Sequence, residues 1–262
     1  MKIGICPWAF DQAVVGRRPL AEITARAGAA GFDAVEASYA AHSRISAPCE
    51  WAVPVTSIAT LALHRFPLTS PNAAHRAAAS EAVRGMIAMA RVLGARSISF
   101  SPGPVRAPNE ATLEACIAAL RTLTDEAAAS GIVLAVENLP GHLLATRQTM
   151  LRLLAAVEGL GLCLDLGNAL ADPPVERWLD TFGDRLVKLH LSDGRIAAEA
   201  LRPTLIGEGD VPWPALRGRL LDLSTAVDIY LETPPRLGIQ SEPEAAALAA
   251  ARLRVAEVLE CA

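Results

Sequence analysis

The chain has 262 residues, of which 52% are hydrophobic and only 4% aromatic, and its formal net charge is −4. This length suffices for one (β/α)-type barrel or two small domains with a large buried core. The slight acidity and the dispersed arginines argue against a nucleic-acid partner, which normally binds a basic stripe. No apolar run is long enough to span a bilayer, so a membrane protein is not expected either.

The expected compartment is the cytoplasm. The N-terminal residues read as a first strand and lack the layout of a signal peptide. The five cysteines are scattered, odd in number and form no Cys-x-x-Cys motif. Free thiols in a reducing compartment are therefore the expectation.

Strand-like and helix-like segments alternate along the whole chain. Short apolar runs bounded by Gly, Pro or polar residues predict strands at 2–6, 32–36, 55–63, 97–100, 132–137, 161–165, 186–190 and 227–232. Amphipathic or Ala-rich stretches predict helices at 19–28, 72–93, 112–130, 146–157, 173–182, 214–223 and 244–259. Thr146 is the expected N-cap of the helix that begins there.

This alternation predicts an α/β fold with a parallel sheet, and eight repeats predict a closed (β/α)8 TIM barrel, a single domain over residues 1–262. A doubly wound open sheet is the alternative. It is disfavoured because no Gly-x-Gly-x-x-Gly follows the first strand, where a dinucleotide-binding fold would carry it.

Four successive predicted strands end on side chains that can bind a metal: Glu137, Asp165, His190 and Glu232. A carboxylate at the end of a buried strand is costly unless it is paired or metal-bound. In a TIM barrel the active site lies at the C-terminal strand ends, so the four should converge. Three carboxylates and one imidazole suit one divalent ion, Mn²⁺, Mg²⁺ or Co²⁺, with Zn²⁺ as a further option. The alternative is that they are ordinary polar strand ends facing solvent.

Four short motifs resemble the xylose-isomerase-like TIM-barrel superfamily, and more narrowly its sugar phosphate isomerase/epimerase branch. They are Val136-Glu137-Asn138, Leu164-Asp165-Leu166-Gly167-Asn168, Leu189-His190-Leu191-Ser192-Asp193 and Gly207-Glu208-Gly209-Asp210-Val211-Pro212-Trp213. The resemblance implies one divalent metal ion held by the four strand-end residues. It also implies that Glu137 and Glu232 act in proton transfer, in an isomerase or epimerase of a small sugar or polyhydroxy carbonyl compound that forms an enediolate.

Two positions depart from the family pattern. Asn168 stands where the family usually has His, and an amide can donate to a sugar hydroxyl but cannot act as an acid at neutral pH. The segment Ser99-Phe100-Ser101-Pro102 lacks the His that the related endonucleases with three zinc ions need after strand four. Both departures argue against a nuclease with three metal ions.

Other functions remain open at this point. The same machinery supports loss of water, so a dehydratase of the inosose or dehydroshikimate type is the alternative within the fold. A metal-dependent hydrolase or endonuclease, and a non-catalytic barrel that senses a ligand, are the others, because one fold hosts many functions. A homo-oligomer is also left open.

A second group of residues is predicted to surround the metal. The candidate substrate contacts are His64, Asn168, Arg195, Glu36 and Trp8. Asp193 and Asn138 are expected to support the metal ligands from behind. His64 could equally be a packed histidine, and Asp193 with Arg195 could equally form an exposed ion pair in a loop.

Lys188 is expected inside the barrel. Alternation along its strand places it on the same face as His190, one layer deeper. A buried ammonium needs an acidic partner, and Asp228 on the neighbouring strand is the candidate.

Overall fold

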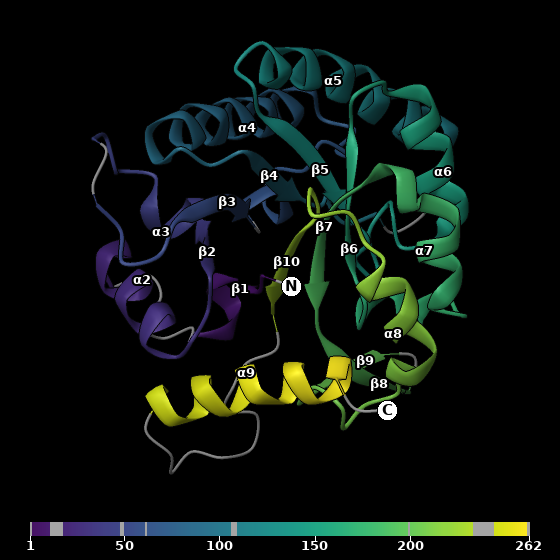
Figure 1. Ribbon diagram of the computed structural model, residues 1–262. Helices are drawn as coiled ribbons and strands as arrows, with labels where there is room; N and C mark the ends of the chain where they lie inside the picture. The colour runs from purple at the N-terminus through teal and green to yellow at the C-terminus, as the bar shows by residue number, and fades with distance from the viewer. Residues whose placement is uncertain are drawn as a thin grey trace.

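Eight parallel strands form a closed barrel in the order β1-β10-β7-β6-β5-β4-β3-β2, with the helices outside it (Figure 1). The structure is a computed structural model that describes residues 2–10, 18–47, 50–60, 62–105, 109–198, 200–232 and 244–260. The predicted (β/α)8 barrel is confirmed, and the doubly wound sheet is excluded by the closure of the sheet. The assignment of all of residues 1–262 to one domain stays a prediction.

The barrel strands lie close to their predicted positions. They are β1 (Gly4–Ile5), β2 (Ala34–Ser38), β3 (Val55–Thr60), β4 (Ser97–Phe100), β5 (Val133–Glu137), β6 (Gly161–Asp165), β7 (Leu186–Leu191) and β10 (Asp228–Leu231). Two ends differ from the prediction. β2 continues two residues beyond Glu36, and β3 stops at Thr60, short of His64. The first difference moves Glu36 from the rim into the barrel.

The helices surround the barrel (Figure 1). They are α2 (Leu20–Ala29), α3 (Tyr39–His42), α4 (Ala73–Leu93), α5 (Glu110–Ala128), α6 (Arg147–Ala156), α7 (Glu176–Phe182), α8 (Trp213–Leu221) and α9 (Glu244–Glu260). The Thr146 hydroxyl accepts a hydrogen bond from the Thr149 backbone N–H, as the predicted N-cap should. In the described part of the chain, no helix is both long enough and apolar enough to cross a membrane.

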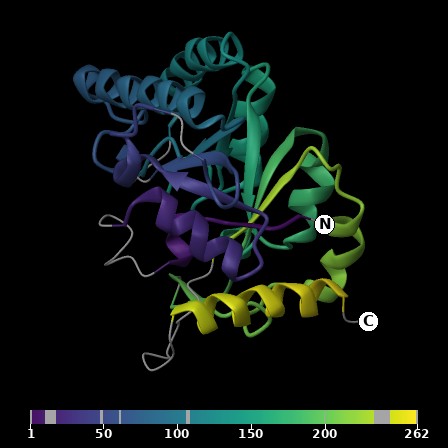
Figure 2. The same ribbon diagram turned by 60° about the vertical axis from the view of Figure 1, so that its left-hand side comes forward.

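The last helix closes the ring of helices. α9 contacts α8 on one side and α2, the first helix of the described chain, on the other. Figure 2 shows α9 running beneath α2, so segments from the two ends of the sequence lie side by side.

A two-stranded antiparallel hairpin follows β7 directly. Its strands are β8 (Asp193–Ala197) and β9 (Ala200–Thr204), with Asp193 paired to Thr204. This hairpin was not predicted, because its sequence lacks the alternation of apolar and polar residues that indicates a strand. It places an additional pair of strands at the rim next to His190.

Candidate metal centre

The four predicted ligands converge at the C-terminal rim of the barrel. Glu137 and Asp165 end β5 and β6, His190 is the penultimate residue of β7, and Glu232 follows β10. These strands are neighbours in the barrel, and Asp165 lies directly opposite His190 in register. One ligand atom from each residue lies within 4.8 Å of the others. The four side chains could therefore hold one metal ion.

Two buried atoms of this cluster lie close together without forming a hydrogen bond. His190 Nδ1 lies 2.5 Å from Glu232 Oε2 and 3.7 Å from Glu137 Oε1. Within the described residues, neither His190 Nδ1 nor Glu232 Oε2 has a hydrogen-bond partner, although both are buried. Such a close approach of an imidazole nitrogen to carboxylates needs a cation at that place, either a proton on Nδ1 or a metal ion. The donor set fits Mn²⁺, Mg²⁺, Co²⁺ or Zn²⁺.

The carboxylates also repel one another. Burial and the charge of Glu232 raise the pKa of the Glu137 carboxyl above its ordinary value. Burial and the charges of Glu232 and Glu137 raise the pKa of Asp165 still more. A divalent cation among them would remove this repulsion, which is a second reason why the residues fit a metal.

Asp165 is held in place by its neighbours. Asn138 forms two hydrogen bonds with its backbone: Nδ2 donates to the Asp165 carbonyl at 2.9 Å, and Oδ1 accepts from the Asp165 N–H at 2.7 Å. Asp165 Oδ1 accepts from the Ser192 hydroxyl at 2.7 Å and from the Asn168 backbone N–H at 2.6 Å. Asn138 thus lies directly behind the cluster. Ser192 was missed, because a serine in a loop carries no signal of its own.

Glu36 lies beneath the cluster, although it was expected to face the mouth of the barrel. Its side chain has 0% exposure, and its Oε2 is 3.1 Å from His190 Nε2. Burial alone raises the pKa of the Glu36 carboxyl, but the charges of Lys188 and His190 outweigh it and hold that pKa well below its usual range. The prediction that Glu36 contacts substrate from the rim is not supported by this depth.

Lys188 is inside the barrel as predicted, with 0% exposure, but its predicted partner was wrong. Its ammonium binds Glu36 rather than Asp228. Asp228 instead pairs with Arg96 at the base of the barrel. Lys188 and Asp228 are neighbours in register on β7 and β10. A lysine chain is longer than this strand spacing, so its ammonium passes its neighbour and reaches the opposite wall.

Asp193 organises the loop after the hairpin. Its buried carboxylate accepts hydrogen bonds from five donors: the backbone N–H groups of Gly194, Gly207, Gly209 and Val211 and the indole N–H of Trp213. Arg195 donates to the Glu208 carbonyl and lies 3.7 Å from Asp210, with 61% of its side chain exposed. Arg195 is therefore exposed in a loop as the alternative expected, but its ion-pair partner is Asp210 rather than the predicted Asp193.

The remaining predicted contacts lie in rim loops. His64 is exposed in the turn Ala62–His64 after β3, and its ring centroid is 4.6 Å from that of His142. Trp8 is half-buried in the turn Pro7–Ala9 after β1. The Asn168 amide donates to Glu137 Oε1 over a long 3.5 Å. Substrate contact by His64, Trp8 and Asn168 stays a prediction.

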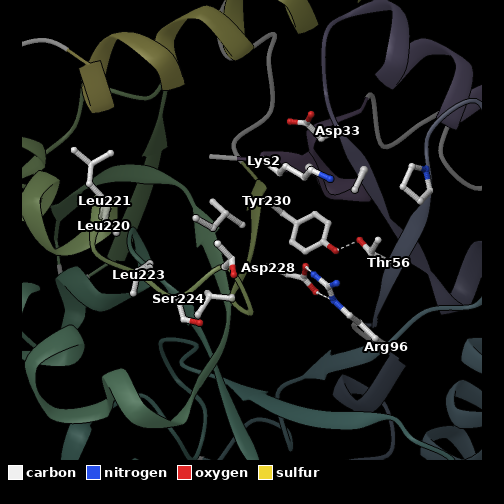
Figure 3. A pocket seen from close by; sticks show the side chains of 16 residues that line it. Lys2, Asp33, Thr56, Arg96, Leu220, Leu221, Leu223, Ser224, Asp228 and Tyr230 are labelled. Carbon is white, nitrogen blue, oxygen red and sulfur yellow. Dashed lines mark hydrogen bonds and ion pairs between the residues drawn. The ribbon is translucent and has the colours of Figure 1, made fainter.

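A cavity of about 700 Å³ lies at the opposite, N-terminal end of the barrel (Figure 3). Two pairs of its polar groups bind each other: Arg96 with Asp228, and the Tyr230 hydroxyl with Thr56. The buried Tyr230 ring also packs against Gly4, where a Cβ atom would come within 2.5 Å of it. TIM-barrel active sites lie at the other end, so we assign this end to stability.

Comparisons with known proteins agree with this geometry. The family model described as xylose isomerase-like TIM barrel matches residues 24–255. Among solved structures, an L-ribulose 3-epimerase is 20% identical with a TM-score of 0.77, covering 99% of this chain and 95% of its own. D-psicose 3-epimerase from Clostridium cellulolyticum H10 is 18% identical with a TM-score of 0.76 and full coverage of both chains, 100% each. The IOLI protein, solved with a zinc atom, is 14% identical with a TM-score of 0.79, covering 99% of this chain and 98% of its own. No curated protein matches in sequence. The chain belongs to the xylose isomerase-like TIM barrel family.

Proposed function

We propose that this protein is a divalent-metal-dependent isomerase or epimerase of a small sugar or polyhydroxy carbonyl compound. The observation that carries the proposal is the cluster of Glu137, Asp165, His190 and Glu232, in which His190 Nδ1 faces two of the carboxylates. The epimerases of similar fold act on ketoses by their names, which supports the same substrate class here. The cytoplasmic location and a homo-oligomeric state stay predictions, although the described cysteines Cys6, Cys116 and Cys163 are free thiols.

The two glutamates flank the cluster. Glu137 belongs to β5 and Glu232 follows β10, the two outer strands of the four, so their carboxylates approach the centre from opposite sides. A bound divalent ion would supply Lewis acidity at a carbonyl oxygen and the adjacent hydroxyl, and so acidify the C–H between them. One glutamate then accepts that proton as a base, and the other is placed to return a proton to the opposite face.

Solvent exchange tests this mechanism. Enzyme, Mn²⁺ and a panel of ketoses and inososes in D₂O should place deuterium at the carbon beside the carbonyl, in product and in recovered substrate. Replacing Glu137 or Glu232 by Gln should slow the exchange by ~10²–10⁴-fold, the usual loss on removing a general acid or base. Both residues also belong to the cluster, so the metal content of each variant is measured in parallel.

Glu126→Gln is the matched control, because Glu126 pairs with Arg84 on the outer surface of the helix layer. It should leave exchange unchanged. Turnover with metal bound and no label on carbon would refute proton transfer and favour a hydride shift or ester hydrolysis. A product lighter by one water would identify the dehydratase instead.

A further inference from the structure

The buried carboxylate of Glu36 connects opposite walls of the barrel. It lies on β2, and its two oxygens have different partners. Oε1 accepts hydrogen bonds from the Ser57 hydroxyl at 2.9 Å, the Ser99 hydroxyl at 3.1 Å and the Lys188 ammonium. Oε2 faces His190 Nε2 at 3.1 Å, across the barrel on β7. Three donors therefore anchor one oxygen, and the other is left for the imidazole.

The contact with Glu36 keeps a proton on Nε2 of His190. An ionised carboxylate can only accept hydrogen bonds, so the nitrogen that faces Glu36 must be the donor. With a metal ion in place of a proton at Nδ1, Nε2 would keep the proton that faces Glu36, and the lone pair on Nδ1 would be directed at the ion, on the side of Glu137 and Glu232. That is the tautomer a metal-binding histidine needs, and a carboxylate behind such a histidine fixes its ring orientation.

Lys188 stabilises the buried carboxylate of Glu36, and the two side chains together add no net charge near the cluster. Its ammonium has three N–H donors, and the three partners are Glu36, Ser57 and Ser99. The pair formed by Lys188 and Glu36 is neutral overall, and both side chains have 0% exposure. The imidazole thus receives an oriented acceptor, while the pair contributes no net charge beneath the three carboxylates of the rim.

We propose that Glu36 is a positioning residue that locks His190 in its metal-binding tautomer and thereby sets the metal affinity of the site. The inference rests on the proposed function only through its metal site, and it does not depend on which reaction the site performs. Lys188, Ser57 and Ser99 act through Glu36, because each of them donates to the oxygen that does not face the imidazole.

Metal affinity is the first test. Titration calorimetry with Mn²⁺ on Glu36→Gln should show binding 10–100-fold weaker than wild type, the usual effect of losing a partner behind a metal ligand. Asp228→Asn is the matched control. It also removes a carboxylate from the strand beside β7, but Asp228 pairs with Arg96 at the base, so affinity should stay at the wild-type value. Wild-type affinity in a folded Glu36→Gln variant would overturn the proposal.

The tautomer is the second test, and it uses the wild-type protein. Nitrogen-15 NMR of histidine-labelled protein loaded with Zn²⁺ should show His190 with its proton on Nε2 and its metal on Nδ1. The reverse assignment overturns the proposal even if Glu36→Gln does not fold. The two proposals can fail separately. If Glu36→Gln binds metal more weakly but the wild-type enzyme exchanges no ketose protons, this inference is supported and the proposed function is refuted. Unchanged binding with normal exchange would do the opposite.

Discussion

Replacing Lys188 by Met should destabilise the protein strongly. The substitution keeps most of the side-chain volume but removes the charge that balances Glu36, and it leaves the carboxylate with only Ser57, Ser99 and His190 as partners. Removing one partner of a buried ion pair costs about 3–5 kcal/mol. Set against a total stability of about 5–15 kcal/mol, this is a large fraction. At about 2–4 °C per kcal/mol, the melting temperature should fall by roughly 6–20 °C.

Urea unfolding of wild type, Lys188→Met, Glu36→Gln and the double variant measures this effect. The double variant removes both charges together, so it should lose less than the sum of the two single variants. Arg84→Met makes the same exchange in the pair with Glu126, where solvent screens both charges, and should cost far less. A Lys188→Met variant within ~0.5 kcal/mol of wild type, the range typical of surface substitutions, would refute the buried ion pair.

Two further predictions concern the rim. Gly209→Ala should destabilise the protein by about 1–3 kcal/mol, because the new Cβ would come within 2.0 Å of Asp193 Oδ1 and 2.5 Å of the Gly194 backbone. Gly218→Ala is the control, because a Cβ there would have nothing within 4 Å. Equal melting temperatures for the two variants would contradict the crowding at Gly209. Burial, and then the charge of His64, lower the pKa of His142 from 6.5 to about 4, so the unfolded chain binds a proton between these values and the folded chain does not. The stability contributed by the neutral ring is thus present above pH 6.5 and lost as the pH falls toward 4. In urea titrations at pH 7 and pH 5, wild type should therefore lose more stability than His142→Asn.

The convergence of the metal ligands could be predicted from the sequence. Each of Glu137, Asp165 and Glu232 stands where an apolar run stops, and such run ends are visible without knowledge of packing. In a parallel barrel all C-terminal strand ends meet at one rim, so topology alone brings these side chains together. The order of the strands and the residue at which each one ends determine the cluster. A local sequence pattern was therefore enough to predict that the ligands converge.

The depth of Glu36 could not be predicted in the same way. Ala37 and Ser38 do not extend an obvious apolar run, yet both belong to β2, and this extension places Glu36 inside the barrel. The partner of Lys188 depends on distances across the barrel, and strand register names only its neighbours. A signal was present in Ser57 and Ser99, because small polar residues inside otherwise apolar strands indicate an interior polar partner.

The interior of this barrel has a polar layer, formed by Lys188 and Glu36, in place of an apolar one. Well-packed hydrophobic residues in place of a buried ion pair are often neutral or stabilising, so stability does not explain why Lys188 and Glu36 are there. Position offers the explanation, because the layer lies directly beneath His190 and its free acceptor faces the imidazole. An apolar layer would let the ring rotate or change tautomer beneath three carboxylates. Local rules of core packing are broken where function requires it, and here the break lies one layer below the metal ligands.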